Sequence, residues 1–223
     1  MLYTIRCTVF MAGALLAGAQ ERFDNSVRAD FFAGFRGNPE AFERAMKKTE
    51  AVLADNPKHA EAMVWHGGGV FVQAGQAARN KDYVQASELW KRGMDEMAAA
   101  VALAPEDAAV LIPRGAILLA ASQAISGDRG KELVKIGLGD YEKTYHIQRA
   151  YFDQLSGHAR GELLFGLGEG YQRLGEDARA REWFEKLAAV NDPANGHLQQ
   201  AKDYLNSGQV TGTRTCVGCH VAK

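Results

Sequence analysis

Three segments of this sequence are amphipathic and end in the same way, at a proline, and this repetition restricts what the chain can fold into. The segments run over residues 43–57, 91–105 and 180–193. Apolar residues recur in each at helical spacing, and proline cannot continue a helix from its interior. Repeated segments of this kind indicate stacked helical hairpins. We therefore predict an all-α fold of stacked antiparallel helical hairpins, separated by short Gly, Asn, Asp and Pro signals.

The clearest repeat unit covers residues 161–194. Its small and large residues stand at helical spacing, and the set is Leu164, Leu167, Gly168, Tyr171, Gly175, Ala180, Phe184, Leu187 and Pro193. This pattern resembles the tetratricopeptide repeat, in which small residues let two helices approach and large ones fill the gap between hairpins. The resemblance implies a right-handed superhelix whose concave face commonly binds partners.

The rest of the chain fits the same pattern less regularly. Residues 26–59 match it weakly, and residues 60–105 are expected to form a repeat with an enlarged connection at residues 74–81. Residues 106–156 are the least regular, because four glycines interrupt the helical pattern: Gly127, Gly130, Gly137 and Gly139. A final helix over residues 191–206 is expected to cover the end of the stack.

The first 19 residues have the pattern of a secretory signal peptide. Arg6 supplies a positive charge, residues 7–16 form an apolar stretch, and Ala17-Gly18-Ala19 is a cleavage signal. We therefore predict a signal peptide at 1–19, a helical-repeat domain at 20–206, and a linker with a C-terminal tail at 207–223. The mature protein is expected to be periplasmic or extracellular, without a transmembrane anchor.

Charge and hydropathy argue against two classes of partner. Without Arg6 the chain keeps 25 basic residues against 27 acidic ones, so the mature protein is slightly acidic. No basic stripe suggests nucleic acid, and after the signal peptide no apolar run is long enough to cross a bilayer.

The most specific chemical motif is C-x-x-C-H, formed by Cys216, Cys219 and His220 in the last eight residues. Its spacing suits two thioether bonds to the vinyl groups of one haem, with the adjacent imidazole as proximal iron ligand. A zinc site would need a fourth ligand. A thioredoxin-like redox pair would need an α/β fold, and a chance occurrence is the remaining alternative. The sequence predicts one covalent haem c on an extended C-terminal tail, as in c-type cytochromes.

Only three residues follow His220, so the tail alone cannot bury a haem. The pocket must come from the helical repeats, of the same chain or of a neighbour. His66 is the leading candidate for the sixth iron ligand, since Trp65 precedes it and Gly67, Gly68 and Gly69 follow it. Each glycine inside a helix costs about 0.8–1.0 kcal/mol relative to alanine. A flat macrocycle close to the backbone would compensate this cost, and tight packing between helices is the alternative.

Other residues are weaker candidates for haem contacts. His158 is the second candidate ligand. His197 has polar sequence neighbours that suggest a solvated position, His146 is also possible, and His59 is expected at the surface. Methionine could ligate instead, although core packing is the commoner role of Met63, Met94 and Met97. Four arginines are candidate partners of the haem propionates: Arg28, Arg36, Arg114 and Arg160.

These features favour electron transfer over catalysis. The sequence has no catalytic motif such as G-x-S-x-G or H-E-x-x-H, so we do not expect an enzyme. The expected partner is a redox protein or a neighbouring copy of the chain. The alternative is a scaffold or assembly protein whose haem tail docks into a neighbouring subunit, giving a head-to-tail oligomer or haem filament. A haem enzyme or gas sensor would need an exchangeable sixth ligand, and nothing in the sequence favours it.

Overall fold

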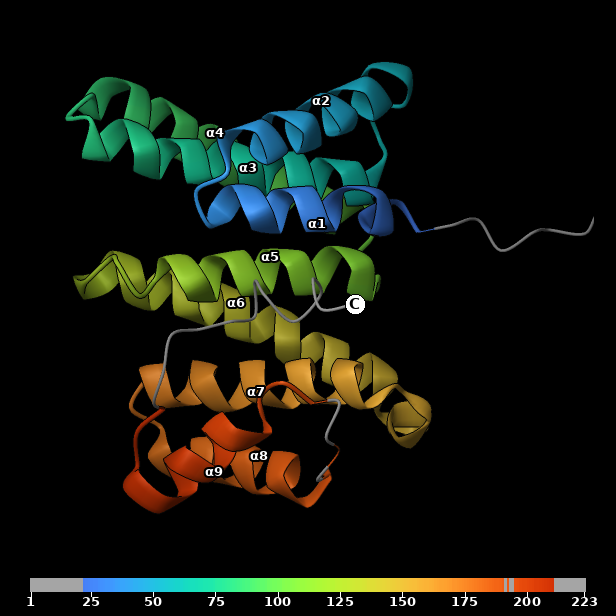
Figure 1. The fold of residues 1–223 in the computed structure, drawn as a ribbon, viewed down its shortest axis with the longest axis vertical. Coiled ribbons are helices and arrows are strands. Elements are labelled where there is room, and N and C mark those ends of the chain that lie inside the picture. Colours follow the sequence, from blue (N-terminus) through green and yellow to red (C-terminus); the bar gives the residue numbers. More distant parts are fainter. Residues whose placement is uncertain (1–21, 191, 193–194, 211–223) are drawn as a thin grey trace, which may run out of the picture.

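Helices account for the architecture of the described chain. A computed structural model describes residues 22–190, 192 and 195–210 (Figure 1), and within these ranges the chain forms no strand. In chain order the helices are α1 (Phe23–Phe35), α2 (Pro39–Asp55), α3 (Ala60–Arg79), α4 (Tyr83–Leu103), α5 (Ala108–Ala121), α6 (Gly127–Gln148), the short 3-10 helix η1 (Arg149–Gln154), α7 (Gly157–Arg173), α8 (Asp177–Val190) and α9 (Leu198–Ser207). The prediction of an all-α fold is confirmed.

Successive helices pack in pairs joined by short turns. The strongest packing joins α1 to α2, α3 to α4, α5 to α6, and α7 to α8, while α9 lies against α8. Along the long axis, α1–α4 occupy one end, α5 and α6 the middle, and α7–α9 the other end (Figure 1). Contacts of α3 with α5 and of α5 with α7 connect the layers. The sequence prediction of stacked hairpins describes this arrangement.

Sequence signals at both ends of the helices explain where they start and stop. Five helices begin behind a side chain that accepts a hydrogen bond from the first turn: Asn38, His59, Asp82, Asp107 and Ser156. At the other end, α2 and α4 stop two residues before Pro57 and Pro105, and α8 stops three residues before Pro193. The prediction that these three segments end at prolines is confirmed.

The buried apolar residues form two cores. The first lies among α1–α6 and is centred on Phe31, Trp65, Phe71 and Met97. The second lies among α5–α9 and includes Tyr141, Phe165 and Phe184. Val210, the last described residue, packs against this second core. The last described residue therefore lies at the α7–α9 end of the molecule.

Two details of the prediction are wrong. No enlarged connection covers residues 74–81, because α3 continues to Arg79 and the turn to α4 is short, with Lys81 at a φ of 63°. The glycines of residues 127–139 do not interrupt a helix, since they belong to α6. A Cβ at Gly137 would lie 2.9 Å from the carbonyl oxygen of Gly115, so this glycine lets α5 and α6 approach closely.

The domain boundaries can be compared only in part. The final helix starts at Leu198 rather than residue 191, and it ends at Ser207, one residue beyond the predicted boundary at 206. Gly208 follows with a φ of 73°, a conformation that suits glycine after a helix. The predicted signal peptide at 1–19 lies outside the described residues. In the described part of the chain, no helix combines the length and hydropathy that crossing a membrane requires.

Candidate functional site

The C-x-x-C-H motif itself, with Cys216, Cys219 and His220, lies outside the described residues. The structure therefore informs the other half of the predicted site, the surfaces that would receive a haem. Among the described residues, no group of three or more His, Cys, Asp and Glu side chains is arranged to hold a metal ion.

His66 is buried on α3 between carboxylates from two other helices. Its Nδ1 lies 2.5 Å from Oε2 of Glu96 on α4, and its Nε2 lies 3.9 Å from Oε1 of Glu50 on α2. Burial alone would raise the pKa of Glu96, but hydrogen bonds from His66 and Arg92 outweigh it, and the pKa is lowered. The ionised Glu96 therefore accepts the Nδ1 proton and fixes the orientation of the ring. A carboxylate on Nδ1 is also how proteins commonly orient a histidine that binds a metal through Nε2.

The three glycines after His66 face protein atoms. A Cβ at Gly67 would lie 2.8 Å from Cβ of Glu96, one at Gly68 would meet Ile117 of α5, and one at Gly69 would meet Met46 of α2. Trp65 stacks on Phe31 with ring centroids 5.3 Å apart. The compensation that the sequence prediction assigned to a flat macrocycle is thus supplied by three neighbouring helices. These contacts match the packing alternative for Trp65 and Gly67–Gly69.

The remaining histidines differ in burial. His158 is partly exposed near the start of α7, with Nε2 3.6 Å from Oε2 of Glu162. His146 is exposed on α6. His59 caps α3 by accepting a hydrogen bond from the backbone N–H of Ala62 at 3.2 Å, which is a structural role.

His197 is not solvated, contrary to the expectation from its polar neighbours. It is 2 % exposed and stacks on Phe165 of α7 with ring centroids 4.2 Å apart. Its Nδ1 lies 2.8 Å from Oε1 of Gln200. The polar sequence context was misleading, because these polar side chains bond to His197 itself: Oδ1 of Asn195 accepts a hydrogen bond from its backbone N–H, and Gln200 contacts its ring.

The methionines have the packing role that their spacing suggested. Met97 is fully buried in the first core, and Met63 and Met94 pack against that core. All three therefore belong to the packing of the first core, as expected for gap-filling methionine.

The four arginines are not equivalent as anion partners. Arg114 makes a two-pronged ion pair with buried Asp140, with Nε–Oδ2 and Nη2–Oδ1 distances of 2.7 and 2.6 Å. Arg28 pairs with Asp24 within α1, and Arg36 is exposed just after α1. Arg160 differs, because its Nε is buried and has no hydrogen-bond partner among the described residues. Its Nη2 is 3.7 Å from Oδ2 of Asp192, beyond hydrogen-bond distance.

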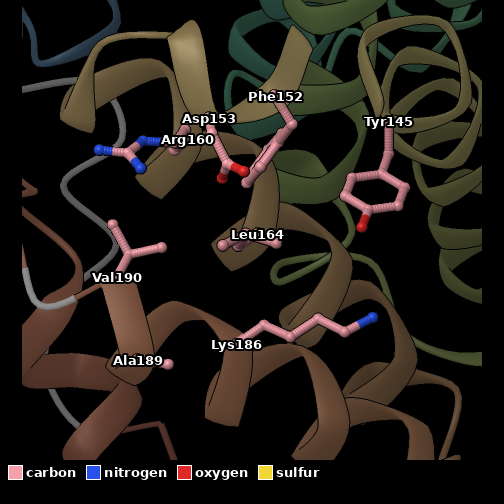
Figure 2. A pocket seen from close by; sticks show the side chains of 8 residues that line it. All are labelled: Tyr145, Phe152, Asp153, Arg160, Leu164, Lys186, Ala189 and Val190. Atoms are coloured by element: carbon pink, nitrogen blue, oxygen red, sulfur yellow. The ribbon is translucent and has the colours of Figure 1, made fainter. Parts of the chain in front are cut away.

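Arg160 borders an open pocket of about 440 Å³ that sequence reasoning missed. The lining comes from α6, η1, α7 and α8 and consists of Tyr145, Phe152, Asp153, Arg160, Leu164, Lys186, Ala189 and Val190 (Figure 2). Figure 2 shows Arg160 and Val190 at one end, Tyr145 and Lys186 at the other, and Leu164 between them. The aromatic residues of the segment 145–152 were a signal in the sequence, but η1, which brings Phe152 back over α7, was not predicted.

The pocket has the chemistry that a porphyrin edge requires. Its lining combines apolar side chains with three charged ones, Asp153, Arg160 and Lys186, and its volume lies within the roughly 300–1,000 Å³ usual for cofactor and ligand sites. Arg160 offers an unsatisfied donor to a carboxylate. Lys186 lies 4.0 Å from the ring centroid of Trp183, so its charge sits on the aromatic wall beside the pocket. Because the pocket is open, a group bound there would stay accessible along one edge.

Comparison of the chain with protein-family models, with curated proteins and with solved structures finds no match. The functional interpretation therefore depends on the chain's own residues.

Proposed function

We propose that this protein is an exported monohaem c-type cytochrome that acts in electron transfer. The observation that carries the proposal is the C-x-x-C-H motif of Cys216, Cys219 and His220 in the last eight residues. The two cysteines bind the haem covalently, and the imidazole of His220 is the proximal iron ligand. The haem iron supplies a reversible one-electron change, and the protein supplies attachment, burial and electrostatic control of the potential.

Two further observations support this proposal. The first 19 residues have the pattern of a signal peptide, which fits a haem attached outside the cytoplasm. The described helices offer a pocket with apolar side chains and an arginine donor, which gives a haem a surface to pack against.

The direct test is maturation of the full chain in cells that carry the c-type haem attachment machinery. We expect a protein whose mass exceeds that of the chain from Gln20 onward by one haem, and whose absorption bands sharpen on reduction as in a cytochrome. The matched control replaces Cys216 and Cys219 by alanine, which should remove the covalent haem and leave the helical content unchanged. A wild-type chain that stays colourless under these conditions would refute the proposal.

The second candidate is a scaffold protein whose haem tail docks into a neighbouring subunit. The observation that favours it is His66, whose Nδ1 is oriented by Glu96 as in many metal-binding histidines, at the end of the molecule away from α9. A concentration-dependent mass that collapses in the cysteine variant would support this function. A monomer at all concentrations would exclude it.

A further inference from the structure

The position of the pocket relative to the end of the chain limits what can occupy it. Helix α9 runs back along α8, and the Tyr204 hydroxyl near its C-terminal end lies 3.5 Å from the carbonyl oxygen of Asp177, the first residue of α8. The pocket lies at the opposite end of α8, where Ala189 and Val190 line it. A helix of 14 residues is about 21 Å long. Val210 therefore lies about one helix length from the pocket.

The tail beyond Val210 is long enough to cover this distance. Six residues lead from Val210 to Cys216, which is at most about 20 Å of extended chain, and ten lead to His220, at most about 35 Å. A haem attached at Cys216 and Cys219 therefore reaches the pocket of its own chain when the segment from Val210 to Cys216 is nearly extended.

The tail from Val210 to His220 is barely long enough to bring the haem to His66 of the same chain. The packed path from α9 to α3 runs through α8, α7 and α5. Four helix-to-helix steps of roughly 8–10 Å each make about 30–40 Å, and His66 faces α2 and α4, on the side of α3 away from that path. Contact between His66 and a haem on the same chain would need an almost fully extended tail.

We propose that the pocket between α6, η1, α7 and α8 is the docking site for the haem carried by the chain's own residues 216–220, with Arg160 binding a propionate. This inference rests on the proposed function. Leu164, Phe152 and Val190 contact one face of the macrocycle, and burying that face removes apolar surface from water. The propionate accepts a hydrogen bond from Nε of Arg160, which is otherwise buried without a partner among the described residues.

The charges around the pocket fit this orientation. Lys186 at the far end is held over the rings of Trp183 and Tyr145, at 4.0 and 5.8 Å from their centroids. Among the described residues, the carboxylate of Asp192 lies 3.7 Å from Arg160, and Asp153 is the one acidic residue of the pocket lining, against the two cations Arg160 and Lys186. A propionate carboxylate should therefore bind most favourably at the Arg160 end of the pocket, because guanidinium binds carboxylates through paired donors.

The experiment compares haem-loaded full-length variants. Arg160→Met removes the charge and keeps the length of the side chain. Arg160→Lys keeps the charge, and Arg181→Met is the matched control, an exposed arginine of α8 paired with Glu185. The readouts are circular dichroism of the Soret band, which reports the asymmetry of the haem surroundings, and the reduction potential. We expect Arg160→Met to weaken the Soret signal and lower the potential, because loss of a cation favours the ferric state, and Arg160→Lys to restore part of both.

A second readout does not depend on any change at Arg160. Haem quenches nearby tryptophan fluorescence, and Trp183 borders the pocket whereas Trp90 lies in the first half, against Phe71 of α3. In the haem-loaded chain, Trp183→Phe should remove little emission, since Trp183 is already quenched. In the haem-free Cys216→Ala, Cys219→Ala chain the same substitution should remove a full share of the emission. Trp90→Phe should remove a similar share in both chains, and therefore more than Trp183→Phe only when the haem is present.

The possible results distinguish the proposed docking site from the proposed cytochrome function. If haem attaches but Arg160→Met behaves like Arg181→Met and Trp183 is no more quenched than Trp90, the docking site is wrong and the cytochrome assignment stands. If the Soret signal disappears on dilution, the occupant is a neighbour's haem, which also overturns docking within one chain. If no haem attaches, the proposed function fails and this inference fails with it.

Discussion

His66 and His197 are buried imidazoles at opposite ends of the molecule, and their surroundings differ in charge and in distance from the tail. His66 is clamped by the ionised Glu96 within the first core and has Glu50 beside its other nitrogen. His197 stacks on Phe165 and bonds to a neutral amide, Gln200, in the half that holds α7–α9. The first site is built from interlocking helices, whereas the second adjoins the end of the described chain.

The two halves are alike in how closely their glycines are packed, because the space beside the glycines of α3 and of α7 is filled by neighbouring side chains or backbone. They differ in open space. Around α7 and α8 a pocket of about 440 Å³ is open and one arginine nitrogen lacks a partner among the described residues. Four predictions test the comparison, beginning with the ion pair that joins the halves.

Arg114→Met should have the largest effect on stability. Arg114 of α5 and Asp140 of α6 pair at the seam between the two cores, and removing one partner of a buried pair typically costs about 3–5 kcal/mol. Burial raises the pKa of Asp140, and Arg114 works against that rise. The variant raises this pKa further, so the destabilisation should be full at pH 7 and shrink as the pH falls toward the pKa of an unfolded Asp, about 4.

Urea unfolding at pH 7 and pH 5 measures this effect. The control is the double variant Arg114→Met, Asp140→Leu, which leaves no unpaired charge and should recover much of the loss. If Arg114→Met alone is as stable as the wild type at pH 7, the packing of α5 against α6 does not depend on this ion pair.

Gly93→Ala should come next, because it tests the tight packing of the first half. A Cβ at this position of α4 would lie 2.6 Å from the backbone nitrogen of Phe71 and 2.7 Å from the carbonyl oxygen of Gly67. Backbone atoms cannot move aside without separating α3 from α4, so overpacking should outweigh the gain in helix propensity, for a net loss of about 2 kcal/mol.

Gly139→Ala is the matched control, a glycine inside α6 with nothing within 4 Å of its added Cβ. It should stabilise the protein by about 0.5–1 kcal/mol. Thermal unfolding of the two variants, measured side by side, should move in opposite directions. Equal shifts would show that α3 and α4 are less closely packed than these distances require.

The sequence predicted most of the fold but little of the surface that a haem would need. Amphipathic spacing and the prolines after α2, α4 and α8 are local signals, so they were sufficient for the helices. The role of Gly67–Gly69 depends on which helices lie across from them, and the burial of His197 depends on a chain reversal after α8. The unpaired Nε of Arg160 likewise depends on long-range packing. A local sequence pattern does not show which distant residues will be in contact after folding.

Glu96→Gln should have a smaller effect that depends on pH. The pKa of Glu96 is lowered in the folded protein, so its contribution to stability is present above the unfolded pKa, about 4.5, and is lost as the pH falls through the folded value. We expect a loss of about 1–2 kcal/mol at pH 7, which shrinks as the pH falls below about 4.5, the unfolded pKa. Glu50→Gln is the control, since its exposed carboxylate is 3.9 Å from His66 and should contribute less than about 0.5 kcal/mol. Urea unfolding at both pH values distinguishes these cases.

His66→Gln should have the smallest effect on the haem, and this is the sharpest test of the contrast between the halves. The Nε2 of His66 faces Glu50 on the side of α3 away from α5, and the tail starts beyond α8 and α9. A monomeric, haem-loaded variant should therefore keep the absorption spectrum of the wild type in both oxidation states, although it loses the hydrogen bond to Glu96.

His197→Gln is the paired variant, because His197 lies within reach of the tail and next to α7. Loss of a low-spin spectrum in the His66 variant alone, at concentrations where the protein is dimeric or larger, would instead place His66 opposite a neighbour's haem. The same loss in a monomer would require a tail extended over the full length of the stack, and the pocket at Arg160 would then be left without its proposed occupant.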